Sequence, residues 1–149
     1  MKITGAAPKI AIPSFVYLLI TIIIDYKYYP IFKITMDNYL ILAIIGVILI
    51  LLGIGIFINV GRKLIKAFNS NLLMTDGLYI VFRNPMYAAY TIFIFPGISL
   101  LLNSWLVLTA VIVNFLFLQI FIKDEYRYLE EKFGEEYKTY LNKVWFKFL

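Results

Sequence analysis

Long and almost uninterrupted apolar runs constrain the fold of this chain more than any other feature. A membrane-spanning helix needs about 20 mostly apolar residues, and four segments reach or approach that length: Ile10–Ile24, Tyr39–Val60, Met86–Leu102 and Trp105–Ile122. Hydrophobic residues make up 62% of the chain and charged residues 15%, whereas roughly half of a soluble domain is apolar. The sequence therefore predicts an all-α integral membrane protein with four spans, forming a single domain over residues 1–149.

The distribution of Lys and Arg predicts the orientation of these spans. With four spans, both termini and the 61–85 connection share one side, and the 25–38 loop and the 103–104 turn share the other. Only Lys27 and Lys33 fall on the second side. Because basic residues are enriched in cytoplasmic loops, we expect both termini in the cytoplasm. The basic residues on the first side are Lys2, Lys9, Arg62, Lys63, Lys66, Arg83, Lys123, Arg127, Lys132, Lys138, Lys143 and Lys147.

The charge balance and the missing residue types exclude several classes of function. The formal net charge of +5 is explained by basic residues that attract anionic membrane lipids, so no nucleic-acid partner is predicted. The chain has no Cys and no His, which excludes disulfides, a thiol nucleophile, an imidazole base and Cys/His metal sites. No metal site is predicted, and any catalysis must use carboxylates, tyrosines, arginine or a bound cofactor.

The predicted domain has two unequal parts. Residues 1–60 form a two-span hairpin with little polar content, which predicts a scaffold, whereas residues 61–149 carry most of the polar chemistry. Gly46 and Gly53 in the second span are typical of a face on which another helix packs closely. That face would also permit a homodimer.

Polar side chains gather at the entrance of the third predicted span and at the exit of the fourth. Asn84 is a candidate N-cap, and Pro85 suits the first turn, where its missing N–H costs nothing. The tight turn at 103–104 makes spans three and four an antiparallel hairpin, which brings Asn84 and Glu125 to one membrane edge.

A further helix is predicted over residues 125–142, beyond the fourth span. Its apolar residues recur at steps of three and four, which is typical of an amphipathic helix, and Gly134 favours a bend or break. The apolar stripe consists of Tyr126, Leu129, Phe133, Tyr137, Tyr140 and Leu141.

Five short motifs follow one another in the carboxyl-terminal half. They are Leu73-Met74-Thr75-Asp76-Gly77-Leu78-Tyr79, Arg83-Asn84-Pro85-Met86-Tyr87, Glu125, Phe133-Gly134-Glu135-Glu136-Tyr137-Lys138-Thr139-Tyr140 and Lys143-Val144. With this order and spacing, residues 73–148 resemble the isoprenylcysteine carboxyl methyltransferase family and its phospholipid methyltransferase relatives.

The resemblance implies methyl transfer from S-adenosyl-L-methionine to a lipophilic small molecule or lipidated substrate, such as a prenylcysteine-type carboxylate. It implies that Glu125 and Arg83 are catalytic. The cofactor-binding residues that it implies are Asn71, Leu72, Leu73, Met74, Tyr79, Asn84, Pro85, Met86, Tyr87 and Glu125.

The residue types suit this cofactor, which has a sulfonium, an amino-acid head and a flat adenine. Glu125 can pair with the ammonium, and Asn84 with the first N–H groups of the third span can receive the carboxylate. Tyr79 and Tyr87 can form an aromatic wall, and the backbone of 71–74 can line the adenine. Displacement by an ionised nucleophile needs positioning and desolvation rather than a base, so the lack of histidine is no obstacle.

Three positions depart from the family pattern. Asn84 stands where the better-known members have His, Tyr126 replaces the second acid, and Phe121 occupies the position of an arginine that holds the substrate carboxylate in prenylcysteine enzymes. Two other hypotheses therefore stay open. One is a phospholipid or quinone methyltransferase, and the other is a non-enzymatic membrane subunit that retains the fold.

Overall fold

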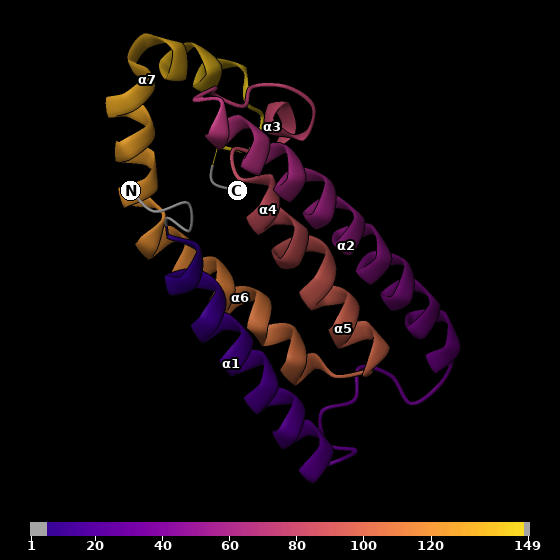
Figure 1. The fold of residues 1–149 in the computed structure, drawn as a ribbon. Helices are drawn as coiled ribbons and strands as arrows, with labels where there is room; N and C mark the ends of the chain where they lie inside the picture. The colour runs from indigo at the N-terminus through magenta and orange to yellow at the C-terminus, as the bar shows by residue number, and fades with distance from the viewer. Residues whose placement is uncertain (1–5, 148–149) are drawn as a thin grey trace.

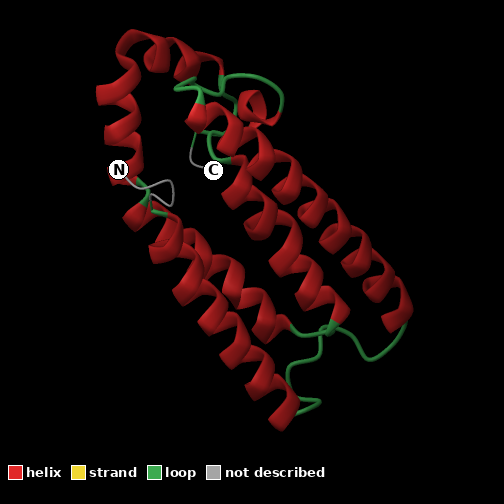
Figure 2. Cartoon of the chain, viewed as in Figure 1, coloured by secondary structure: helices red, strands yellow, loops and turns green. Residues whose placement is uncertain are grey.

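The computed structural model describes residues 6–147, which are helical over most of their length (Figure 2). Lys2, which contributed to the predicted orientation, lies outside the described residues. No extended strand forms within 6–147, where the β-type pairing is limited to two isolated bridges. The elements are α1 (Ala7–Lys27), α2 (Tyr39–Asn69), α3 (Leu78–Val81), α4 (Pro85–Ala88), the π-helix η1 (Ala89–Ile94), α5 (Phe95–Leu101), α6 (Trp105–Phe121) and α7 (Lys123–Lys143).

The long helices form two pairs. In the first pair α1 lies along α6, and in the second α2 lies along the continuous run α4–η1–α5 (Figure 1). The pairs are joined at one end by the α5–α6 turn. At the opposite end, which we call the α7 end, α7 continues from α6 and reaches across toward α3 (Figure 1).

Two of the four predicted spans are helices long and apolar enough to cross a membrane by themselves. They are α1 and residues 39–67 of α2. A third span results if α6 and α7, bent by 43° relative to each other, count as one, and the apolar run Pro85–Leu101 is shorter. Seventeen residues, the length of α6, rise about 25 Å, less than the roughly 30 Å hydrocarbon core. The described structure thus contains two or three candidate spans, and four spans stay a prediction.

Glycines allow α2 to approach the second half of the chain closely. A Cβ atom at Gly46 would lie 2.7 Å from the carbonyl oxygen of Gly97 in α5, and one at Gly53 would lie 2.6 Å from the Ile94 side chain. The close helix packing predicted at these glycines therefore occurs within the chain. Because α5 and η1 already cover this face, the glycines offer no support for the homodimer, which stays a prediction.

The predicted hairpin between the third and fourth apolar runs is confirmed. Asn103 adopts a positive φ of 54° in the turn, and the Ser104 hydroxyl accepts the Val107 N–H at the start of α6. The Asn103 amide group donates to the Thr35 carbonyl at 2.7 Å and accepts the Thr35 N–H at 3.0 Å. The loop between α1 and α2 therefore holds this turn in place.

The α7 end has its own small core. Gly134 has φ +49° and non-helical backbone angles, so the predicted interruption of the last helix is confirmed. After this break, α7 buries Tyr137 and Tyr140 against α2 and α3, with Val144 beside them. The segment that follows pairs with the chain after α3, because Phe146 donates to the Val81 carbonyl at 2.9 Å and accepts the Arg83 N–H at 3.1 Å.

Candidate functional site

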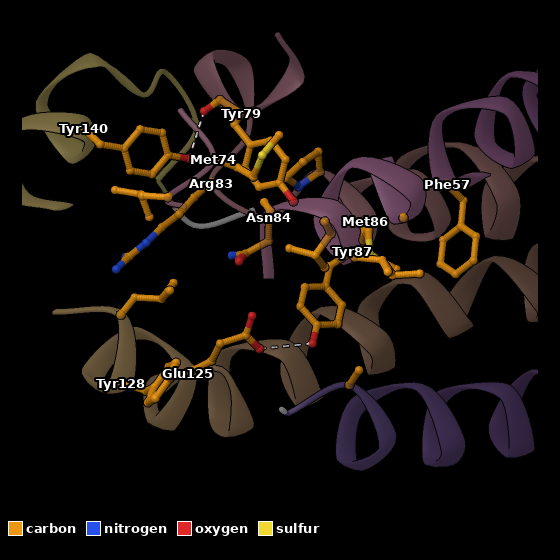
Figure 3. Close-up of a pocket in the computed structure, with 18 of the residues that line it drawn as sticks. Phe57, Met74, Tyr79, Arg83, Asn84, Met86, Tyr87, Glu125, Tyr128 and Tyr140 are labelled. Atoms are coloured by element: carbon orange, nitrogen blue, oxygen red, sulfur yellow. Dashed lines mark hydrogen bonds between the residues drawn. The ribbon is translucent and has the colours of Figure 1, made fainter. Parts of the chain in front are cut away.

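A cavity of about 490 Å³ lies at the α7 end, between the two helix pairs (Figure 3). Nine of the ten predicted cofactor-binding residues line it, and so does Arg83, although they come from three separate stretches of sequence. These lining residues are Leu72, Leu73, Met74, Tyr79, Arg83, Asn84, Pro85, Met86, Tyr87 and Glu125. Asn71 lies outside the lining, and its exposed side chain accepts a hydrogen bond from Lys132 at 2.7 Å.

Glu125 faces the cavity from the first turn of α7. Its Oε2 accepts the Tyr87 hydroxyl at 3.5 Å (Figure 3), and the backbone N–H of Ala6 at the start of α1 also donates to the carboxylate. Burial raises the pKa of Glu125 above its ordinary value, and the two hydrogen bonds offset part of this increase. The carboxylate is thus partly desolvated, which strengthens its interaction with any cation that enters.

Arg83 is held between two tyrosines of α7. Its guanidinium carbon lies 3.2 Å from the centre of the Tyr126 ring, and its Nε and Nη2 donate to the Tyr137 hydroxyl at 3.0 and 2.6 Å. Tyr126, which replaces the second acid of the family pattern, therefore supplies a cation–π partner for Arg83. Burial raises the pKa of Tyr137, and Arg83 lowers it in part, so Tyr137 is a neutral phenol at neutral pH.

Asn84 takes the predicted position, but its side chain has a different partner. It is the N-cap residue of α4, and Pro85 begins the helix as predicted. However, the side chain makes no capping hydrogen bond and instead donates to the Tyr126 hydroxyl. The first backbone N–H groups of α4 are therefore not satisfied by the Asn84 side chain.

Tyr79 is buried at the cavity and is held through its backbone. Its backbone carbonyl accepts the buried Tyr140 hydroxyl at 2.9 Å (Figure 3), and burial raises the pKa of its own hydroxyl. Tyr140 thereby attaches α3 to the end of α7. From this position Tyr79 lines the cavity.

The cavity walls that α1 and α2 contribute were not predicted from the sequence. Residues 1–60 were expected to be a scaffold, yet Ala11 and Phe15 of α1 and Phe57 of α2 line the cavity, as does the adjacent Gly61. No motif marks these positions. Tyr90 was also missed, although it follows Tyr87 by one helical turn. Further lining comes from α7, where Tyr137 and Tyr140 belong to the motif that begins at Phe133.

The cavity has a polar end and an apolar end. Arg83, Asn84 and Glu125 lie at the polar end, whereas Phe57 lies at the other end in Figure 3. At the apolar end the Tyr90 ring is 6.2 Å from the rings of both Phe15 and Phe57. Such a cavity can hold a charged group at one end and hydrocarbon at the other.

The sequence matches the family model for phospholipid methyltransferase over residues 40–136. This region includes every predicted site residue but leaves out α1. No curated protein and no solved structure matches the chain significantly. Members of this family are membrane methyltransferases. Because the match covers well over half of the sequence, the chain belongs to the phospholipid methyltransferase family.

Proposed function

We propose that this protein transfers a methyl group from S-adenosylmethionine to a lipophilic acceptor at the α7 end of the bundle. The observation that carries the proposal is the single cavity in which Glu125, a set of tyrosines and an apolar end meet. Methyltransferases of this family generally use S-adenosylmethionine. When bound, this cofactor would supply a methyl group carried on a positively charged sulfur.

The chemistry of the cavity residues fits that cofactor. Glu125, the acidic residue in the described lining, would pair with the ammonium group, and its desolvation favours this contact. The first N–H groups of α4, left uncapped by Asn84, would bind the carboxylate. The rings of Tyr79 and Tyr87 would face the sulfonium, since aromatic faces attract cations.

Arg83 has a different task in this proposal. Its guanidinium already contacts Tyr126 and Tyr137, so it would hold α7 against the site while its charge acts on the acceptor. The Leu72–Met74 side chains, which line the cavity, would cover the adenine. Closing the site in this way excludes water from the reacting groups.

The acceptor would reach the site from the bilayer. Phe15 and Phe57 line the cavity, and each side chain is about 40% exposed, at 41% and 39%. They belong to the two helices that qualify as membrane spans. In this arrangement the four apolar runs all cross the membrane, and the α7 end and both termini face the cytoplasm, where the cofactor is available.

Calorimetry with S-adenosylhomocysteine, the demethylated product, in detergent tests the proposal. We expect binding by the wild type and a loss of roughly a hundredfold in Glu125→Gln, as is common when a buried charge contact is removed. Asp124→Asn is the matched control, because Asp124 is exposed and does not line the cavity. Undetectable binding to the wild type would instead favour a non-enzymatic subunit.

The headgroup of the acceptor distinguishes two versions of the function. The first is carboxyl O-methylation of a prenylcysteine-type substrate, and the second is N-methylation of a phospholipid amine. The second is favoured by the family match and by the two tyrosine partners that already engage Arg83, the residue best suited to a carboxylate. Radiolabelled methyl in extracted phospholipid headgroups would choose the second version, and label released by mild base would choose the first.

A further inference from the structure

A polar contact crosses the bundle between α6 and η1. Asn114 lies in the middle of α6 and is fully buried, although this helix is otherwise strongly apolar. Its Nδ2 lies 2.5 Å from the Thr91 hydroxyl oxygen in η1. Because α6 leads into α7, which carries Glu125, and η1 follows α4, which carries Tyr87, this contact connects the two helix pairs that bear these residues.

The hydrogen-bond directions in this contact are fixed by the donors present. Thr91 has one hydroxyl hydrogen, and it points to the Tyr87 carbonyl at 2.7 Å. The Thr91 oxygen can therefore only accept from Asn114, whose amide must act as the donor. A continuous chain results, from Asn114 through Thr91 to the backbone of Tyr87, the residue whose hydroxyl contacts Glu125.

The contact lies where the second helix pair is least regular. Thr91 belongs to the six-residue π-helical segment η1, and π-helical turns are uncommon and often occur at functional sites. The pairs also meet where Asn84 donates to Tyr126. The helical run that carries Tyr87 is thus held to the other pair at two places, by Asn114 and by α7.

An asparagine at position 114 lowers the stability of the fold, which argues against a purely structural role. The Asn114 Oδ1 has no hydrogen-bond partner among the described residues although it is buried, and such an atom is destabilising in an apolar environment. Leucine has the same number and branching of side-chain heavy atoms, although its methyl groups are bulkier, and it would remove that penalty. What leucine lacks is the donor that fixes Thr91.

We propose that Asn114 is a positioning residue: by donating to Thr91 it sets the separation of the two helix pairs and hence the position of Tyr87 relative to Glu125. The proposal rests on the proposed function only in its effect on the cofactor. The separation of the two helix pairs is a property of the bundle itself. Cofactor affinity and the separation of the pairs can therefore be measured independently.

The first measurement is S-adenosylhomocysteine affinity in Asn114→Leu, Thr91→Val and Thr91→Ser. We expect roughly tenfold weaker binding in the first two, because small displacements of a positioned group are costly, and near-wild-type binding in Thr91→Ser, which keeps the hydroxyl. In a Tyr87→Phe background, Asn114→Leu should change the affinity by less than about twofold, since coupled residues are not additive.

Thr109→Val is the matched control. It removes an interhelical hydrogen bond of similar kind, between Tyr17 and Thr109 at 3.0 Å, which joins α1 to α6 and does not reach the cavity. Both valine variants should lower the melting temperature, but only Thr91→Val should weaken binding. Equal affinities in Asn114→Leu and wild type, or an undiminished effect in the Tyr87→Phe background, would overturn the proposal.

The second measurement does not need the cofactor. The chain has no Cys, so spin labels can be attached to Lys63→Cys in α2 and Arg127→Cys in α7, both of which are exposed. We expect the distance distribution between the labels to broaden in Asn114→Leu and to stay narrow in Thr109→Val. If the wild type binds no cofactor, the proposed function fails, and this distribution decides the role of Asn114 alone; an unchanged distribution rejects it.

Discussion

The Tyr87 hydroxyl donates to Glu125 Oε2 at 3.5 Å and so connects the two helix pairs across the cavity. Tyr87 lies in α4, which belongs to one pair, and Glu125 lies in the first turn of α7, which continues from α6 of the other pair. A long hydrogen bond of this kind is weak and can be exchanged for a ligand at little cost. Glu125 is therefore positioned by Tyr87, while its carboxylate stays available to a ligand.

Acid should have opposite effects on ligand affinity and on stability. The raised pKa of Glu125 means that the folded protein takes up a proton more readily than the unfolded chain. Stability should therefore increase as the pH falls from the folded pKa toward the ordinary value of 4.5, because the folded state binds more protons in this window. Affinity for S-adenosylhomocysteine should decrease over the same window, since the ammonium needs the ionised acid.

Melting curves and calorimetry across this pH range measure both effects. In Glu125→Gln, which resembles the protonated acid, the stability increase assigned to this residue should disappear. Parallel acid responses of Glu125→Gln and wild type would assign the titration to other groups.

Filling the cavity from α2 should block binding while preserving the fold. A Cβ atom at Gly61 meets no atom within 4 Å, although Gly61 lines the cavity, so Gly61→Leu would project into open space. We expect ligand binding to be lost and the melting temperature to be kept or slightly raised, because glycine is a poor helix former by about 1 kcal/mol. Gly55→Leu is the control, since Gly55 also has open space but lies outside the lining.

Adding a single carbon to the α2–α5 contact should be costly. The Cβ of Gly46→Ala would lie 2.7 Å from a backbone oxygen and 2.8 Å from the Leu101 nitrogen, and neither backbone atom can move freely. We expect a loss of about 1–3 kcal/mol, as in other overpacked interiors. Thermal unfolding in detergent measures it, and Gly55→Ala should be neutral or stabilising. Equal stability of the two variants would show that the helices separate easily.

The geometry of Arg83 should matter more than its charge. Lysine keeps the charge but cannot lie flat on Tyr126 while donating twice to Tyr137, so Arg83→Lys loses the stacked contact. Cation–π contacts contribute about 0.5–2 kcal/mol depending on burial, and a loss of stability in this range at the α7 end is expected, with slower methyl transfer. Arg62→Lys, at an exposed position of α2, should change neither quantity.

Helix positions were predictable because they depend on local sequence. The apolar runs predicted α1 and α2, Pro85 marked the start of the third run, and Gly134 marked the break in α7. The tight turn also predicted that Asn84 and Glu125 would meet at one end, which the Tyr87–Glu125 contact bears out. Span number was harder, since apolar length alone does not separate a short crossing helix from a packed one.

Side-chain partners were not predictable, because they depend on how distant helices pack. The Asn84 side chain was expected to cap its own helix, but its amide instead donates a hydrogen bond to the nearby Tyr126 hydroxyl. Phe15 and Phe57 look like ordinary lipid-facing residues in sequence, and only the separation of the helix pairs places them at the cavity. Asn71 was included because the backbone of 71–74 was expected to line the adenine, yet the chain turns there with φ +54°, and Asn71 lies outside the cavity lining.

The backbone pairing of Arg83 with Phe146 has a consequence for the order of assembly. These residues are 63 positions apart (146 − 83), whereas the α5–α6 hairpin forms from neighbours in sequence. Contacts between distant residues generally form late, since closing a long loop costs entropy first. We expect the helices to form and insert before the rim around Arg83 is complete. A fully helical, membrane-inserted protein can then still be inactive, and a defect confined to this pairing would escape any assay that measures only insertion or helix content.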